Sequence, residues 1–344
     1  MKAHPPSSQL FPARDAAVLL LICVLLFLAW KPTYAQASNG RIAFLSDRDG
    51  SPKLYTMQPD GTDVQLFGNG ILEEAGTISS FAISPDGSKA SFISQKNRDG
   101  TYPRDELFLL DLVENNVIQL TQDGLNKANV IWLSDSSLAY LSGGPELDYV
   151  RISRIALETG QIQIIADSYA ISQSIGTELG VSIRELSISP DHQQLVAGVH
   201  TSLPEAYDGL VVMGVDGTNI HQVTPNNLDS FVPIWSMDPN IVYFGCGFED
   251  NDEICQMNLQ TSESQVVTDF QSSLPGESTH YIGKIDVSPA NLLLFQLYFS
   301  EHIYSLNPDD GSIINITEGD TSNNQFLGWI NEPVGISSEV TRRS

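Results

Sequence analysis

Acidic side chains beside turns are the first groups in this sequence that could do chemistry. The run Asp47-Arg48-Asp49-Gly50 superficially resembles a calcium-binding loop. The further ligands and the terminal Glu of such a loop are missing, which favours a plain β-turn. We therefore expect no cofactor, with calcium as the one alternative.

Histidines are the second such group, and three of them, His200, His280 and His302, fall in successive repeats of the chain. A shared metal site is one interpretation, because imidazole is a common metal ligand. Separate surface or hydrogen-bonded histidines are the interpretation we favour, because each residue belongs to a different repeat. The sequence also lacks the G-x-S-x-G, H-E-x-x-H, C-x-x-C and Walker motifs, so we expect a non-catalytic protein.

The charge balance limits the class of partner. The 344 residues carry a formal net charge of −25, and only 17% of them are charged, so the acidity comes from scarce Lys and Arg. A nucleic-acid partner requires a basic footprint and is therefore excluded. Two interpretations stay open: an acidic surface that keeps the protein soluble, which we favour, and an acidic face for a cationic partner.

Residues 1–37 are typical of a targeting segment. Lys2 and Arg14 precede an apolar run at residues 16–30, and an A-Q-A pattern at residues 35–37 matches a cleavage site. The apolar run is shorter than the roughly 20 residues that a membrane-spanning helix needs. We predict a cleaved signal peptide and a periplasmic or secreted protein. The alternative is a membrane tether through an uncleaved signal anchor.

Two cysteines, Cys246 and Cys255, remain once Cys23 is removed with the targeting segment. An even number of cysteines in an exported chain predicts a disulfide. The two residues flank an expected hairpin loop at residues 249–252, which would place them opposite each other on paired strands. The alternative is two reduced cysteines in the core.

A pattern of short apolar runs and tight turns repeats along the chain from Arg41. A first run ends near Ser-Pro-Asp-Gly, and second, third and fourth runs follow it. The first run occurs six times, with 42 to 56 residues between the equivalent positions Ser84, Leu133, Ser189, Ser236, Ser288 and Ile330. This period indicates six supersecondary units, each a four-stranded antiparallel meander. No stretch after residue 38 shows convincing helical periodicity.

Several middle runs are apolar on both faces, as at residues 107–110, 241–244 and 292–295. In an antiparallel sheet, burial of both faces means that another sheet covers each of them. A ring of small sheets satisfies this requirement. The sequence therefore predicts an all-β, six-bladed β-propeller of four-stranded antiparallel blades over residues 38–331, followed by a short tail at 332–344.

The repeat resembles the Pro-Asp-Gly repeat of the TolB-like six-bladed propellers. The residues that carry the resemblance are 42–57, 81–87, 186–191 and 233–236. The resemblance implies that the Ser-Pro-Asp run is innermost in each blade, so the C-terminal run at residues 325–330 should pair with the N-terminal strands and close the ring. It extends to the propeller alone, without the N-terminal domain of that family, so the partner contacts of that domain are not carried over.

Loop lengths predict which face of the propeller binds. The turns that join first to second runs and third to fourth runs are tight, and a meander places them on one face. The long loops fall on the opposite face, which we call the long-loop face: residues 68–79, 95–105, 168–181, 201–208 and 270–280. The candidate binding residues on this face are Asp47, Asp49, Glu73, Glu74, Arg98, Arg104, Glu249, Asp250 and Asp252.

These observations lead to three functional hypotheses. We favour an exported, monomeric, non-catalytic propeller that binds a partner protein or peptide on its long-loop face. The alternative is a propeller enzyme that hydrolyses glycans or lactones, with acidic residues or a calcium ion at the channel mouth. A structural spacer or adhesion module is the third hypothesis, because one fold hosts many functions.

Overall fold

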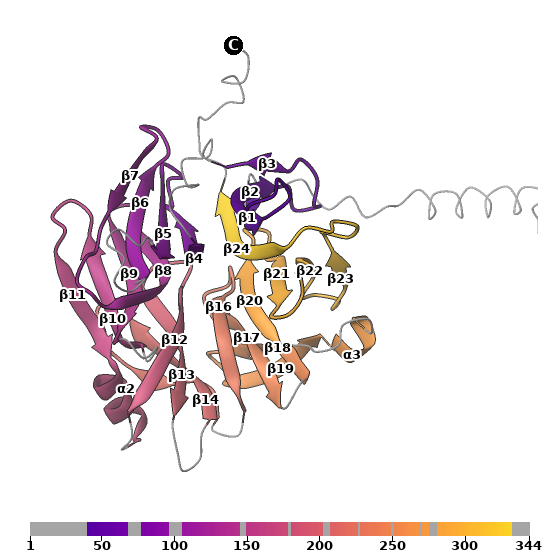
Figure 1. Ribbon diagram of the computed structural model, residues 1–344. Helices are drawn as coiled ribbons and strands as arrows, with labels where there is room; N and C mark the ends of the chain where they lie inside the picture. The colour runs from indigo at the N-terminus through magenta and orange to yellow at the C-terminus, as the bar shows by residue number, and fades with distance from the viewer. Residues whose placement is uncertain are drawn as a thin grey trace, which may run out of the picture. The chain divides into compact units, whose positions relative to one another are not determined.

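The repeats fold into six four-stranded antiparallel sheets within the described part of the computed structural model (Figure 1). The structure describes residues 40–67, 77–95, 105–144, 149–177, 180–201, 207–225, 228–248, 251–268, 270–274 and 281–331. The predicted targeting segment and the predicted tail lie outside these residues. The six-bladed propeller predicted from the repeat is confirmed.

Each sheet is a simple meander from an innermost to an outermost strand. The innermost strands are β4 (Thr77–Ile83), β8 (Asn126–Ser134), β12 (Val181–Ile188), β16 (Ser230–Trp235), β20 (Ile282–Val287) and β24 (Asn324–Asn331). The second strands are β5 (Lys89–Gln95), β9 (Ser137–Gly143), β13 (Gln194–Thr201), β17 (Ile241–Phe248), β21 (Leu293–Leu297) and β1 (Gly40–Ser46).

The outer strands follow in the same order. The third strands are β6 (Asp105–Asp111), β10 (Tyr149–Ala156), β14 (Tyr207–Gly214), β18 (Asn251–Asn258), β22 (Tyr304–Leu306) and β2 (Lys53–Met57). The fourth strands are β7 (Asn116–Gln119), β11 (Ile162–Asp167), β15 (His221–Gln222), β19 (Glu263–Thr268), β23 (Ile313–Asn315) and β3 (Gln65–Leu66). The fourth strands are mostly exposed, as outer edges should be.

The Ser-Pro-Asp-Gly segments form tight turns because their side chains bond to the turn itself. Between β4 and β5, the Asp86 carboxylate accepts hydrogen bonds from the Ser84 hydroxyl at 2.6 Å and from the Ser88 N–H at 2.9 Å. The Ser84 hydroxyl bond also holds the pKa of Asp86 below its ordinary value. Gly87 follows with a φ of 70°, a backbone conformation that glycine adopts without a steric penalty.

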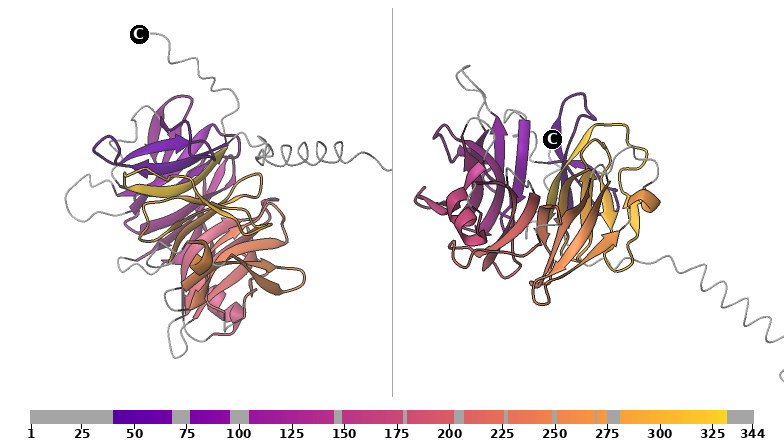
Figure 2. Two further views of the ribbon diagram at one scale, coloured as in Figure 1. Left: turned by 90° about the vertical axis from the view of Figure 1, so that its right-hand side faces the viewer. Right: turned by 90° about the horizontal axis from the view of Figure 1, so that it is seen from below.

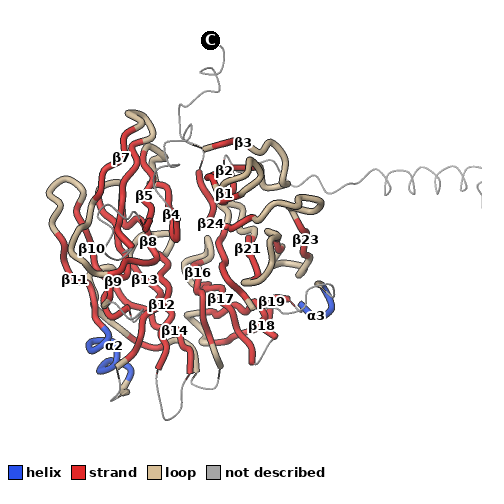
Figure 3. The backbone as a smooth tube through the Cα atoms, viewed as in Figure 1, coloured by secondary structure: helices blue, strands red, loops and turns tan. Residues whose placement is uncertain are grey.

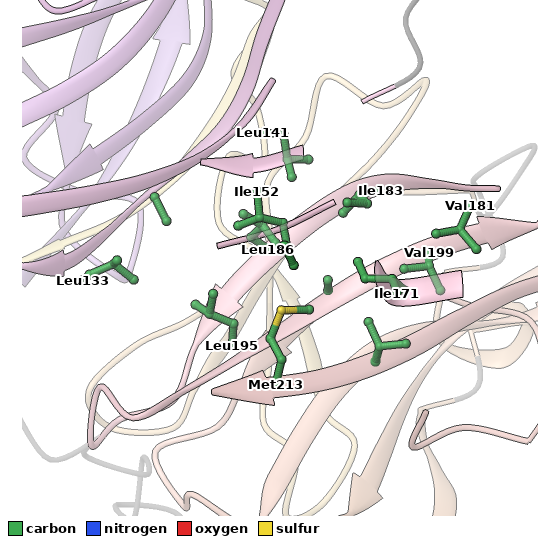
Figure 4. Packing of buried hydrophobic residues seen from close by; sticks show 14 residues of the cluster. Leu133, Leu141, Ile152, Ile171, Val181, Ile183, Leu186, Leu195, Val199 and Met213 are labelled. Atoms are coloured by element: carbon green, nitrogen blue, oxygen red, sulfur yellow. The ribbon is translucent and has the colours of Figure 1, made fainter. Parts of the chain in front are cut away.

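Neighbouring sheets pack face to face around a ring, with the innermost strands gathered toward its middle (Figures 1 and 2). Figure 4 shows one such interface, where residues of β9 and β10 meet residues of β12, β13 and β14. Leu141, Ile152, Leu195 and Met213 are fully buried there. This packing explains why the middle runs are apolar on both faces, because each face of a sheet packs against the neighbouring sheet.

The ring is closed by the C-terminal strand. β24 pairs with β1 in antiparallel register, from Ser46 opposite Asn324 to Gly40 opposite Asn331. One sheet thus contains β24 together with β1, β2 and β3. The predicted three-plus-one closure is confirmed, and it leaves no innermost strand without a partner among the described sheets.

Two short helices lie between the sheets, although no stretch after residue 38 shows convincing helical periodicity. The helix α2 (Ser168–Ile175) follows β11 and lies at the edge of the ring (Figure 3). The Asp167 carboxylate accepts from the Ala170 N–H at its N-terminus, Gly176 ends it in the left-handed conformation, and Ile171 is buried beneath it. A second, four-residue helix, α3 (Phe270–Ser273), lies in another long connection. Both helices are too short to show a helical period of apolar residues in the sequence.

In the portion of the chain that is described, no helix meets the length and apolarity needed to cross a membrane.

A disulfide joins Cys246 in β17 to Cys255 in β18, with Cα atoms 5.9 Å apart. The pairing register differs from the expected one. Cys246 lies opposite Glu253, and Cys255 lies opposite Phe244, because the strands continue to Phe248 and resume at Asn251. The bond therefore runs diagonally across the two strands.

Removal of this disulfide should lower stability without disassembling the propeller. The bond closes a loop of nine residues, and a loop of this size stabilises by about 2–3 kcal/mol in the chain-entropy model. We expect the double substitution Cys246→Ala and Cys255→Ala to lower the free energy of unfolding by about 2 kcal/mol. Urea unfolding of the oxidised protein and of this variant measures the difference. An equal unfolding midpoint for both would contradict a stabilising role for the bond.

Candidate functional site

The residues predicted for the long-loop face lie in different parts of the chain, and the structure describes only three of them. Glu73, Glu74, Arg98, Arg104, Glu249 and Asp250 lie outside the described residues. Asp47 and Asp49 lie in the connection between β1 and β2, and Asp252 lies near the start of β18. The structure does not bring these three acids together, because Asp47 and Asp49 belong to the sheet that contains β24 and Asp252 belongs to another sheet.

Asp47 and Asp49 are engaged in holding the connection in place. Asp47 accepts hydrogen bonds from the backbone N–H and the side-chain amide of Asn323. Asp49 accepts from the Tyr55 hydroxyl at 2.6 Å. We interpret both acids as structural, because Asp47 fastens the β1–β2 connection to the segment that leads into β24 and Asp49 bonds to Tyr55 in β2.

Asp252 instead lines a cavity of about 550 Å³ at the long-loop end of three neighbouring innermost strands. The walls come from the innermost strands β12, β16 and β20, from β14, β17 and β18, and from the connections beside them. The lining residues are Arg184, Glu185, Asp208, Asp229, Phe231, Val232, Gly247, Asp252, Tyr281, Ile282, Gly283, Tyr298 and Phe299. None of them except Asp252 was predicted from the sequence.

β-bulges in the innermost strands place the side chains of this wall. The pairing register shifts between Ile183 and Glu185 in β12, and between Ile282 and Lys284 in β20. A bulge adds one residue to a strand and re-aims the side chains beside it. The inserted residues, Arg184 and Gly283, both line the cavity.

The bulge in β16 contains a strained residue. Val232 has a φ of 48°, in the left-handed region that a β-branched side chain rarely adopts. Such a conformation costs on the order of 1–3 kcal/mol and is often found where function requires it. Val232 lines the cavity, and its backbone N–H bonds to the Glu185 carboxylate. The strain thus helps to position an acid of the site.

Glu185 is the most perturbed acid of the cavity. Burial raises its pKa from 4.5 to about 7, and the neighbouring Arg184, the Val232 N–H and Lys284 only partly offset this rise. One carboxylate oxygen, Oε2, is enclosed and has no hydrogen-bond partner within the described structure. It packs against Gly198 of β13, where an added Cβ would lie 2.6 Å from it. A larger residue at this position would therefore displace the Glu185 carboxylate.

Lys284 and Asp286 extend the charged group along β20. They are two residues apart, so both side chains lie on the same face of the strand. The Asp286 carboxylate accepts from the Trp329 N–H at 2.6 Å and from the Val287 N–H at 2.8 Å. Burial raises the pKa of Asp286 and lowers that of Lys284, and the opposite charge of each partly offsets both shifts.

Three further acids surround the opening. Asp208 pairs with the His200 imidazole at 2.6 Å, and the Asp208 N–H donates to Asp229 at 3.4 Å. Asp252 accepts from the Ile282 N–H at 2.8 Å. These bonds fix the positions of the carboxylates at the ends of β14, β16 and β18.

Aromatic side chains form the rim. Tyr298 and Phe299 follow β21 and are 73% and 72% exposed. Their rings meet edge to face, with centroids 5.2 Å apart, and Phe299 meets Tyr281 in the same way at 6.3 Å. Exposed aromatic rings beside a cavity with several carboxylates can stack on a ligand and pair with a charge.

The histidines predicted as an alternative metal site do not form one group. His200 pairs with Asp208, His302 lies 3.4 Å from the Thr317 hydroxyl, and His280 is outside the described residues. Across the described ranges, no group of three or more His, Cys, Asp or Glu side chains is arranged to hold a metal ion.

The sequence did carry a signal for the missed residues. Arg184 and Glu185 interrupt an otherwise apolar innermost run, and Lys284 and Asp286 do the same in β20. Charged residues are rarely buried without a partner, so a charge inside a run that must be internal marks a special position.

No protein-family model matches the sequence, and no curated protein matches it in sequence. Solved structures do match. TolB from Acinetobacter baumannii aligns with a TM-score of 0.59 and 14% identity over 92% of this chain and 72% of that chain. A chain of a nidogen–laminin complex aligns with a TM-score of 0.60 and 11% identity over 84% of this chain and 97% of that chain.

An oligogalacturonate lyase from Vibrio parahaemolyticus aligns with a TM-score of 0.51 and 14% identity over 80% of this chain and 73% of that chain. Identities this low establish the fold and leave the activity of the chain undetermined. The described sheets, their closure by β24 and these similarities show that the chain has the TolB-like six-bladed β-propeller fold.

Proposed function

We propose that this chain is an exported, non-catalytic propeller that binds a segment of a partner protein in the cavity on its long-loop face. The observation that carries the proposal is the cavity itself, about 550 Å³ with the exposed Tyr298 and Phe299 at its rim. Large, exposed, rigid aromatic side chains are enriched where proteins bind one another. A rigid ring of sheets holds them in place, as a binding site requires.

Two further observations support the proposal. The Cys246–Cys255 disulfide fits an extracytoplasmic location, because disulfides persist in oxidising compartments. We place the protein in the periplasm or outside the cell, and a membrane tether through residues 1–37 is the alternative. Among the structural relatives, the nidogen–laminin chain was solved as part of a protein–protein complex.

Capture of partners from cell-envelope extracts tests this proposal. We expect the double variant Tyr298→Ala and Phe299→Ala to lose at least 10-fold of the captured partner, because hot-spot aromatics contribute on the order of 1.4 kcal/mol or more. The control is Tyr169→Ala in α2, an aromatic side chain that is 70% exposed and does not line the cavity. Equal capture by the double variant and the control would show that the cavity is not the binding site.

An enzyme is the second candidate, and a specific observation favours it. Glu185 has a pKa of about 7 inside a cavity that also holds other carboxylates, which is the property of a general acid. One structural relative is an oligogalacturonate lyase. Release of reducing ends from a panel of glycans, with and without calcium, tests this candidate. Turnover that disappears in Glu185→Gln would replace the binding proposal with a catalytic one.

A further inference from the structure

We propose that the cavity recognises the guanidinium group of an arginine in the partner segment, with lysine as the weaker ligand. This inference rests on the proposed function, and it states the chemistry of the occupant. Four of the lining residues carry carboxyl groups, Glu185, Asp208, Asp229 and Asp252, and one, Arg184, carries a guanidinium. Lys284 partly offsets the charge of Glu185 and His200 pairs with Asp208, so Asp229 is the acid best placed to receive a further cation. A surplus of acids in a partly enclosed site favours a cationic ligand.

Asp229 has the capacity to pair with an additional cation. Its carboxylate accepts a long 3.4 Å hydrogen bond from the Asp208 N–H. A carboxylate can accept several hydrogen bonds. An arginine side chain at Asp229 would pair with an acid that directly precedes β16 and is held in place by that strand.

The aromatic rim adds a second attraction. Tyr298 and Phe299 expose their rings beside the acids, and a guanidinium stacks favourably on an aromatic face. Arginine is favoured over lysine because its planar group can stack and form paired hydrogen bonds at the same time.

The chain already contains an arginine held in this way. Arg48 lies over the rings of Phe44 and Tyr55, with its Cζ 5.1 and 5.0 Å from their centroids. The same guanidinium pairs with Asp320 at 2.8 Å. An acid and two aromatic rings thus help to position a guanidinium in this protein, together with hydrogen bonds to Ser46 and Asn324. The cavity offers the same two groups to a partner.

Selection from a random 12-residue peptide library displayed on phage, with the full chain as target, tests the inference. We expect the enriched peptides to share an arginine. A synthetic copy with citrulline at that position keeps the shape and removes the charge, and we expect it to bind at least 10-fold more weakly.

A variant pair locates the effect in the cavity. Asp229→Asn should weaken the arginine peptide at least fivefold and change binding of the citrulline peptide by less than twofold. The control is Asp309→Asn, which removes one acid from an exposed turn outside the cavity and should change neither affinity. Urea unfolding of both variants verifies that they are folded, and the citrulline comparison needs no variant.

The outcomes separate this inference from the proposed function. Enriched peptides that lack a basic residue, yet lose binding in the Tyr298→Ala and Phe299→Ala variant, would overturn the arginine inference and leave the proposed function standing. Peptides whose binding is unaffected by that double variant would overturn both. Equal affinity for the arginine and citrulline peptides would also overturn the inference.

Discussion

Replacement of Asp286 by alanine should lower the free energy of unfolding by about 3 kcal/mol, because removing one of two neighbouring buried opposite charges leaves the other without compensation. The Asp286 carboxylate accepts from the N–H groups of Val287 and Trp329 and lies beside Lys284. Trp329 belongs to β24, so the same substitution removes a tie between β20 and the strand that closes the ring. We choose the low end of the usual range because solvent partly reaches Lys284 and Asp286.

Two variants separate the charge from the hydrogen bonds. Asp286→Asn keeps an acceptor oxygen and the volume, so we expect it to cost about half as much as Asp286→Ala. Adding Lys284→Met to Asp286→Ala removes the uncompensated ammonium and should recover part of the loss. Urea unfolding midpoints measure all three. If Asp309→Ala, an exposed control, costs as much as Asp286→Ala, the buried pair has no special role.

Replacement of Glu185 by glutamine should stabilise the protein above pH 7 and have little effect below pH 4.5. A rise of the pKa from 4.5 to about 7 corresponds to a penalty of about 3 kcal/mol for the ionised form in the folded state. Glutamine keeps the shape of the side chain and cannot ionise. The gain in unfolding free energy should therefore approach about 3 kcal/mol at alkaline pH.

The sign follows from proton binding. Below pH 4.5, Glu185 is protonated in the folded and the unfolded chain, so its titration does not affect stability. Between pH 4.5 and about 7, the unfolded chain has lost this proton and the folded chain keeps it, so stability falls as pH rises. Urea unfolding across this range measures the effect. As a control, Glu263→Gln in the exposed strand β19 should give no comparable gain. A constant difference between Glu185→Gln and the wild-type chain at all pH values would contradict the raised pKa.

The repeats could be predicted from the sequence because they depend on local patterns, whereas the closure of the ring was implied by the resemblance to the TolB-like propellers. The tight turn at Asp86 is built by side chains within two residues of it, and such turns set the period of the repeat. The disulfide partners could also be named, since only two cysteines remain after the targeting segment. Their diagonal register could not, because the two strands extend closer to the turn than the polar residues 249–252 suggest.

Most residues of the candidate site could not be predicted from the sequence. Asp47 and Asp49 were chosen for their place in a loop, yet both bond to neighbours within the chain. Glu185 went unnoticed because it lies inside an innermost strand, where the bulge at Arg184 changes the direction of the side chains. A bulge depends on the pairing of two strands and produces no hydrophobic period in the sequence from which it could be predicted.

The sequence by itself determined six sheets of four strands, because the alternation of apolar runs and turn residues acts within a few residues of the chain. The pairing of β24 with β1 was implied by the resemblance to the TolB-like propellers. Only the tertiary structure decided where a ligand could bind. The cavity joins Glu185, Asp229, Asp252 and Phe299 from three different sheets. Residues so far apart in the chain meet only through the packing of one sheet against the next, and the strained Val232 shows that this packing can override local backbone preference.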